Sequence, residues 1–270
     1  QYKKYLGKEF GTTMLGFRGD EPDFGRLPWT PTIIETFKAQ KGYDPTPYLA
    51  SFLTSTLTWK EQRVKADYWD VWSNLFAKNF FQQQADWCDT NGVGHITHLN
   101  HDDEMPGCIK SEGDFFRDLS KVQVPGIDAI WNQIWPGKEN DYPKQPSSIA
   151  HVYGKPRVFS ESFAAYYTSP SIPEAKFVVD YQIARGINFF EFMFWASKSK
   201  QKTWMSDPNM KSLNDYTNRT TYLLTQGKPG ARIALYYPIA TLWQGNNQAY
   251  KDIVTISHQL LQHQRDFDYL

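Results

Sequence analysis

The sequence predicts an α/β protein, with a (β/α)8-type barrel followed by the beginning of a second α/β domain. Short apolar runs alternate with stretches of helical periodicity, which is the order of elements in a parallel barrel. Charged residues repeatedly follow these apolar runs, as they do where chemistry lies on the loops at strand carboxyl ends. Residues 188–195 are almost wholly apolar, as expected for a strand covered on both faces.

The N-terminal third is predicted to contain one strand and three helices. Leu15–Phe17 is a short apolar run that ends in a polar cluster. A helix follows between Thr30, which can cap it, and Gly42, which can end it, and a second short helix starts near Pro47. From residue 60 to residue 91 the apolar positions recur at steps of three and four, the pattern of a long amphipathic helix.

The middle of the chain continues the same alternation. Four further strands are predicted at 94–100, 125–130, 157–160 and 188–195, with helices at 112–121, 147–152 and 173–186. A closed barrel needs eight strands, and only about five are found before residue 200. We therefore expect the chain to hold the later strands of the barrel and to be part of a longer polypeptide.

The C-terminal part of the sequence departs from the pattern of the barrel. Residues 200–228 are polar and are predicted to be loop-like. A strand at 232–237, a helix at 252–264 and the final residues 267–270 predict the opening β-α-β unit of a second domain. We therefore assign residues 1–222 to the barrel and residues 223–270 to the start of that domain.

Composition excludes several kinds of partner. Lys+Arg and Asp+Glu both number 29, so the net charge is zero and no basic surface for nucleic acid is indicated. No apolar run approaches the length of a membrane span. Aromatic residues make up 16% of the chain, which fits a sugar-binding site and equally a large α/β core. Cys88 and Cys108 have no metal-like spacing, so the sequence requires neither a disulfide framework nor a cofactor.

Two carboxylates are candidates for acid–base chemistry. Glu21 and Glu161 each lie just past a predicted buried strand, so a barrel would bring them to the same opening although they are far apart in sequence. Cleavage of a glycosidic bond needs such a pair, one acid to protonate the leaving oxygen and one carboxylate at or near the anomeric carbon. The alternative is that Glu21 belongs to a polar turn and Glu161 is a solvated loop charge.

A polar cluster follows the strand at 94–100. The loop residues after that strand could gather round a metal, but His95 and His98 are three apart and so point to opposite faces of a strand. The other two interpretations are recognition of sugar hydroxyls and a purely structural strand end. The candidates for sugar recognition are His98, Asn100, His101 and Asp102.

Other polar and aromatic residues are also candidates for substrate binding. Asp128 and Glu191 lie within apolar strand runs, where a lone charge is costly unless it is paired or faces the opening of the barrel. Four tryptophans could stack on a sugar ring, although packing in the core explains each of them equally well. They are Trp29, Trp131, Trp135 and Trp195. Asp20, next to Glu21, is a like charge that would raise the pKa of a catalytic acid.

Three segments resemble one known enzyme family. Residues 16–24, followed by Pro28-Trp29-Thr30, residues 157–163 and residues 186–190 look like glycoside hydrolase family 106, which contains α-L-rhamnosidases. The similarity covers most of residues 5–200. Tyr236-Tyr237-Pro238 and residues 264–269 resemble the α/β domain that follows the barrel in such proteins.

The resemblance implies an inverting hydrolase of a terminal sugar, α-L-rhamnose. Glu21 matches the general-acid position after barrel strand four, and Glu161 matches the base position after strand seven. Calcium near the sugar in that family implies a metal here, whose ligands the sequence does not identify. The alternatives are a retaining β-galactosidase-like glycosidase and a sugar-binding module without catalysis. We expect a bacterial protein that is secreted or periplasmic and acts on polysaccharide.

Overall fold

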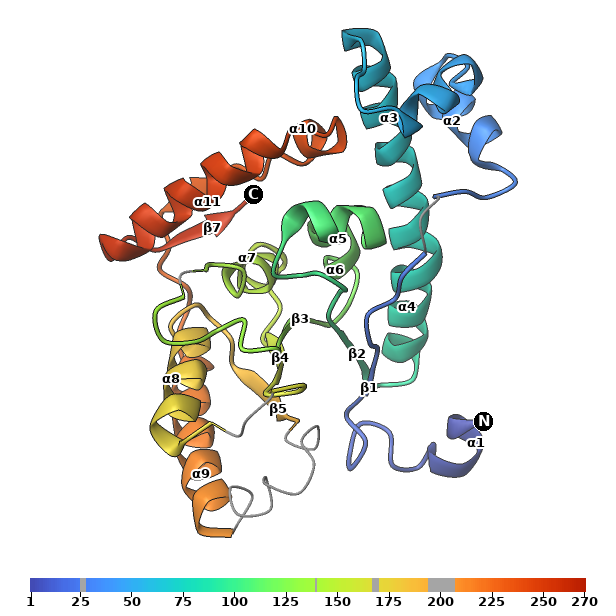
Figure 1. Ribbon diagram of the computed structural model, residues 1–270. Coiled ribbons are helices and arrows are strands. Elements are labelled where there is room, and N and C mark those ends of the chain that lie inside the picture. Colours follow the sequence, from blue (N-terminus) through green and yellow to red (C-terminus); the bar gives the residue numbers. More distant parts are fainter. Residues whose placement is uncertain (25–27, 139, 167–169, 194–206) are drawn as a thin grey trace.

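The centre of the molecule is a five-stranded parallel sheet. The computed structural model describes residues 1–24, 28–138, 140–166, 170–193 and 207–270. The strands run in sequence order across the sheet, and it curls into a half-barrel with helices outside it (Figure 1), which confirms the predicted fold class. The strands are β1 (Gly16–Arg18), β2 (Gly94–Thr97), β3 (Val124–Ala129), β4 (Phe159–Ser162) and β5 (Phe189–Phe192).

The connections between these strands are helical. After α1 (Tyr2–Leu6) and β1, the chain forms α2 (Ile33–Lys41), the 3-10 helix η1 (Thr46–Leu53), α3 (Trp59–Phe76), the π-helical turn η2 (Ala77–Gln82) and α4 (Gln83–Thr90). Between β2 and β3 lie α5 (Met105–Glu112) and α6 (Phe115–Leu119). The later helices are α7 (Lys144–Tyr153), α8 (Ile172–Ile183) and α9 (Asp207–Leu224). Within the described residues, no helix is both long and apolar enough to cross a membrane.

Helix boundaries follow the caps that the sequence provides. The long helix begins after Thr58, whose side chain accepts from the Glu61 N–H while the Glu61 carboxylate accepts from the Thr58 N–H. The helix predicted at Thr30 begins instead at Ile33, and Gly42 ends it with a left-handed backbone. The helix predicted at 112–121 is the shorter α6, which Asp114 caps by accepting from two backbone N–H groups. The sequence did not predict α5, which ends at Glu112.

One prediction about secondary structure is wrong. Most of the stretch predicted to be loop-like, residues 200–228, forms the 18-residue helix α9. Its buried positions are Leu213, Thr217 and Thr221, at helical spacing. Two of these are threonines, and the Thr221 hydroxyl donates to the Thr217 carbonyl at 2.8 Å. A buried face made of small polar residues gives no apolar periodicity, which is why the sequence did not predict this helix.

Alternation along β4 assigns its two faces. Ser160 and Ser162 both hydrogen-bond Gln182 of α8, so they face the outer helices. Phe159 and Glu161 point the other way, toward Arg18 of β1. Glu161 therefore lies within the strand rather than just past it, which corrects the predicted strand end.

The register places three acids in one row. Asp128 of β3 pairs with Glu161 of β4, and Glu161 pairs with Glu191 of β5. Paired residues on neighbouring parallel strands point to the same face and are about 4.8 Å apart along the sheet. The prediction that Asp128 and Glu191 lie within strands is confirmed.

The C-terminal residues form a second, smaller sheet. The strands β6 (Ile233–Leu235) and β7 (Phe267–Tyr269) are parallel, and α10 (Ile239–Trp243) and α11 (Asn247–Gln262) connect them. This is the expected β-α-β order. The buried Lys144 of α7 pairs with Asp266 at 2.8 Å, so the unit is tied to the helices of the half-barrel. The domain boundary after residue 222 stays a prediction, and α9 ends two residues beyond it.

Gly126 is the position at which we expect the sheet to tolerate a side chain least. A Cβ there would lie 2.6 Å from Cδ1 of Phe159 and 3.0 Å from its carbonyl oxygen. We expect Gly126→Ala to lower the free energy of unfolding by about 1–3 kcal/mol, measured by urea denaturation. Gly227→Ala is the control, since a Cβ there meets nothing within 4 Å. Equal stability of both variants would contradict this packing.

Candidate active site

The predicted acids meet at the carboxyl ends of the strands. Asp20 and Glu21 follow β1, and His98 follows β2. Asp128, Glu161 and Glu191 come from β3, β4 and β5. The loop after β1 passes close to β2, because a Cβ at Gly19 would lie 2.9 Å from Oγ1 of Thr97. Glycine at this position lets Asp20 and Glu21 reach His98.

Arg18 connects the two ends of the half-barrel. Its Nη2 forms an ion pair with Oε2 of Glu161, and its Nε lies 3.1 Å from Oε2 of Glu191. Nη2 also lies 3.4 Å from Oδ1 of Asp20, and the guanidinium stands 5.7 Å from the centre of the Phe159 ring. One cation from β1 therefore faces carboxylates from β4, β5 and its own loop.

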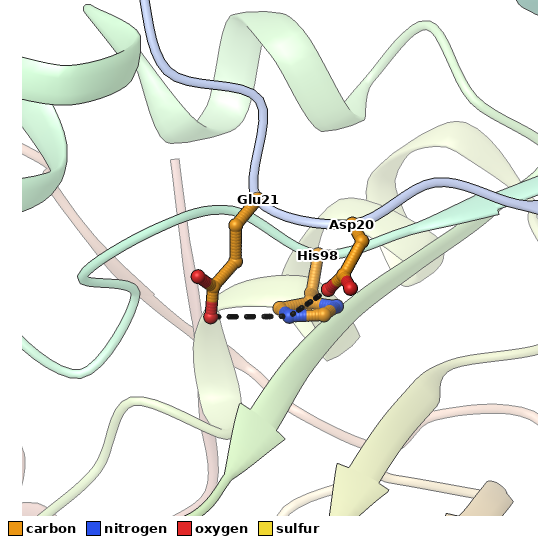
Figure 2. Close-up of side chains that lie close together, drawn as sticks. All are labelled: Asp20, Glu21 and His98. Carbon is orange, nitrogen blue, oxygen red and sulfur yellow. Dashed lines mark ion pairs between the residues drawn. The ribbon is translucent and has the colours of Figure 1, made fainter. Parts of the chain in front are cut away.

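A second group of acids surrounds His98. Its ring is buried, and Nε2 lies 3.4 Å from Oδ1 of Asp20, 3.7 Å from Oε1 of Glu21 and 3.8 Å from Oδ2 of Asp128. Figure 2 shows the carboxylates of Asp20 and Glu21 converging on this imidazole from the loop above it. Asp20 contacts both Arg18 and His98, so Glu21 and Glu161 are members of one connected group.

The proton in this group lies on Asp128 rather than on Glu21. Interaction with His98 holds the pKa of Glu21 below its usual value, although partial burial acts in the opposite direction. Burial and the neighbouring Glu21 carboxylate raise the pKa of Asp128 to about 8. The expectation of a raised pKa for Glu21 is therefore wrong, because the interaction with the nearby imidazole lowers it. At neutral pH the Glu21–Asp128 pair holds one proton.

Glu21 and Asp128 differ in how far their side chains are exposed to solvent. The Glu21 side chain is 40% exposed, whereas the Asp128 side chain is 6% exposed. Glu21 also has a positive φ of 32°, a strained backbone for a residue with a side chain. A ligand can therefore reach Glu21 directly, whereas Asp128 is buried.

The other candidates from the loop after β2 have different environments. Asp102 is buried and accepts from the Asp128 N–H at 2.8 Å, so it fixes the backbone of β3. Burial, together with the neighbouring Asp128 carboxyl group, raises the pKa of Asp102 well above its usual range. The Asn100 N–H donates to Glu112 of α5. His101 is exposed and has a φ of 56°, and its charge contributes to the lowered pKa of Glu21.

The tryptophans predicted to stack on a sugar include two that are exposed. Trp29 is 54% exposed in the segment between β1 and α2, and Trp131 is 53% exposed just after β3. Both lie on loops at strand carboxyl ends, where a ring face can meet a sugar. Trp195 lies outside the described residues.

The donor set at His98 does not fit the calcium that the resemblance implies. Among the described residues, Asp20, Glu21 and His98 form a group whose ligand atoms all lie within 4.8 Å of one another. Calcium takes six to eight oxygen ligands, whereas this group offers two carboxylates and an imidazole. The Arg18 guanidinium beside Asp20 is a further positive charge at the same place.

The fold brings carboxylates from distant parts of the chain into one connected group. Glu21 is exposed and lies beside the buried, protonated Asp128, whereas Glu161 is buried and is paired with Arg18. A family model described as alpha-L-rhamnosidase, glycoside hydrolase family 106, matches residues 1–270. The chain belongs to this family.

One curated protein and two solved structures are similar to this family 106 chain. A protein of Formosa agariphila named "Putative beta-glucuronidase" is 25% identical over 261 residues, which are 86% of this chain and 20% of that protein. The rhamnosidase of Novosphingobium sp. PP1Y superposes on all of this chain with a TM-score of 0.72 at 20% identity. A β-galactosidase of Rahnella sp. R3 superposes on 98% with a TM-score of 0.64 at 12% identity.

The family 106 chain is short beside these proteins. It spans 20% of the Formosa protein, 27% of the rhamnosidase and 46% of the β-galactosidase. The two structural likenesses show the fold alone.

Sequence reasoning missed Arg18. It is the last residue of β1 and stands two positions before Asp20. A cation at a strand carboxyl end beside two acids was a usable signal, but only the curl of the sheet brings it to β4 and β5.

The raised pKa of Asp128 predicts a dependence of stability on pH. Folding lifts this pKa from 3.8 to about 8, so between these values the folded state holds a proton that the unfolded chain releases. The free energy of unfolding should therefore fall as pH rises through this range. Asp128→Asn should reduce that fall, measured by denaturant unfolding at several pH values.

A second buried acid and a control variant matter for the interpretation of that experiment. Burial also raises the pKa of Glu112 to about 8, so the fall should shrink rather than disappear. Asp215→Asn, on the exposed face of α9, is the matched control and should keep the wild-type slope. A wild-type slope in Asp128→Asn would show that Asp128 is ionised throughout.

Proposed function

We propose that this chain carries the reaction centre of a glycoside hydrolase that releases a terminal sugar, α-L-rhamnose, with inversion. The observation that carries the proposal is the linkage of Glu21 and Glu161 through Asp20 and Arg18 in one cluster. Membership in the α-L-rhamnosidase family supports the reaction and the sugar. Carbohydrate is therefore the proposed partner.

In this proposal Glu21 is the general acid. It protonates the glycosidic oxygen as the bond to the anomeric carbon breaks. The proton comes from the Glu21–Asp128 pair, in which Asp128 stores it before the substrate arrives. A bound sugar displaces water from the exposed side of Glu21, which raises the pKa of that carboxyl and favours transfer of the proton to it.

Glu161 is the proposed general base. As a carboxylate it accepts a proton from the water that attacks the anomeric carbon from the opposite face. Asp20, His98, Asn100, His101, Glu191, Trp29 and Trp195 remain predicted sugar contacts. Asp102 acts instead through the β3 backbone that carries Asp128. A secreted or periplasmic location and a polysaccharide source stay predictions.

The first test removes each acid in turn from the full-length enzyme. Glu21→Gln and Glu161→Gln should each reduce kcat on an aryl α-L-rhamnoside by about a hundredfold or more, because each removes one proton transfer. Glu35→Gln, on the exposed face of α2, is the control. A panel of aryl rhamnosides, glucuronides and galactosides identifies the sugar. Full activity in either acid variant would remove that residue from the mechanism.

The configuration of the product tests the mechanism separately. Direct attack of water on an α-L-rhamnoside should release β-L-rhamnose first, visible by NMR before mutarotation. Release of the α-anomer would indicate a covalent intermediate and the retaining mechanism.

The proton held by the Glu21–Asp128 pair gives a third test of the proposed function. Activity should fall as pH rises past about 8, where the Glu21–Asp128 pair loses its proton. In Asp128→Asn the amide donates to Glu21 and stabilises the ionised form, so this basic limb of kcat/KM should move to lower pH. An unchanged basic limb in that variant would mean that Asp128 holds no catalytic proton.

A further inference from the structure

The row of acids across the sheet poses an electrostatic problem. Asp128, Glu161 and Glu191 are register neighbours on three adjacent strands and point to the same face. A carboxylate between two others takes up a proton more readily, since each neighbouring negative charge raises its pKa. A protonated Glu161 could not accept a proton from water, so the proposed base needs a compensating charge.

Arg18 is the cation that meets this need. Its guanidinium is paired with Glu161 and Glu191 at once, through two different nitrogens. Other titratable groups near Glu161 include Asp20, which also contacts Arg18, and its register neighbour Asp128 on β3. His98 after β2 lies close to both of these acids. Arginine keeps its charge at every pH at which proteins are stable, so it favours the Glu161 carboxylate throughout the working range.

The geometry also restricts movement of Glu161. The guanidinium stands over the Phe159 ring, two residues before Glu161 on the same face of β4. Gly126 on β3 makes room for that ring, since a Cβ there would contact it at 2.6 Å. Arg18 thus contacts the Phe159 ring and, through Nε, Glu191, while its Nη2 pairs with Glu161.

We propose that Arg18 is a positioning residue for Glu161, which keeps the carboxylate ionised and directed across the half-barrel, and that Glu191 anchors the guanidinium. The inference rests on the proposed function, because it gives Arg18 a role only if Glu161 is the base. Lysine could replace the charge but not the two-sided contact, since an ammonium group lacks the planar fork of nitrogens.

The test is the pH dependence of kcat/KM of the full-length enzyme on an aryl α-L-rhamnoside. Removal of a paired cation raises a carboxylate pKa by about 1–3, so Arg18→Met should lose about tenfold or more at pH 5 and much less at pH 8. The acid limb of the profile should move to higher pH. Arg18→Lys should keep the acid limb near its wild-type position and lose mainly kcat.

A double variant separates charge from packing. In Arg18→Met/Glu191→Gln one like charge beside Glu161 is also removed, so the acid limb should return part of the way toward lower pH. A purely structural role for Arg18 predicts the opposite pattern, with equal loss at all pH values and no rescue by removal of Glu191. That pattern, or an unmoved acid limb in Arg18→Met, would overturn the inference.

The outcome is distinguishable from failure of the proposed function. If Glu161→Gln keeps wild-type activity, the assignment of the base fails and the inference fails with it. If Glu161→Gln is inactive and the acid limb of Arg18→Met does not move, only the role of Arg18 is refuted. Near-UV circular dichroism checks folding, and if Arg18→Met does not fold, Arg18→Lys decides the question: an acid limb shifted upward despite the retained charge would contradict the proposal.

Discussion

Repulsion among the carboxylates of Asp128, Glu161 and Glu191 is the constraint with which the rest of the site must be compatible. Parallel register places the three side chains on one face of neighbouring strands. Three ionised acids at that spacing would destabilise the sheet and one another. The structure resolves the conflict in two ways. Asp128 is buried and holds a proton at neutral pH, whereas Glu161 and Glu191 share the Arg18 guanidinium.

This distribution of charge produces two chemically distinct carboxyl sites from one row. At the β1–β3 side, Glu21 and Asp128 share a proton beside His98. At the β4–β5 side, Glu161 and Glu191 are both paired with the permanent cation of Arg18. Two carboxyl environments of opposite protonation are what acid–base cleavage of a glycosidic bond requires. Asp20 lies between them and contacts both His98 and Arg18.

The sequence predicted much of the architecture from simple patterns. Apolar runs identified all five strands of the half-barrel. The prediction that β5 is covered on both faces is wrong, because none of its four residues is buried. Amphipathic spacing found the long helix before β2. Alternation of strands and helices then indicated a barrel, which also explained why Glu21 and Glu161 could approach each other. The helix α9 escaped detection because threonines occupy much of its buried face.

The sequence by itself determined that the chain alternates between strand and helix and that Glu21 and Glu161 lie in or near the carboxyl ends of strands, because both follow from local periodicity. Only the tertiary structure decided the partners and the charges. Arg18 meets Glu161 because the sheet curls, and no local pattern encodes that curvature. The proton resides on Asp128 rather than Glu21 because burial differs between them, and burial is a property of the assembled fold.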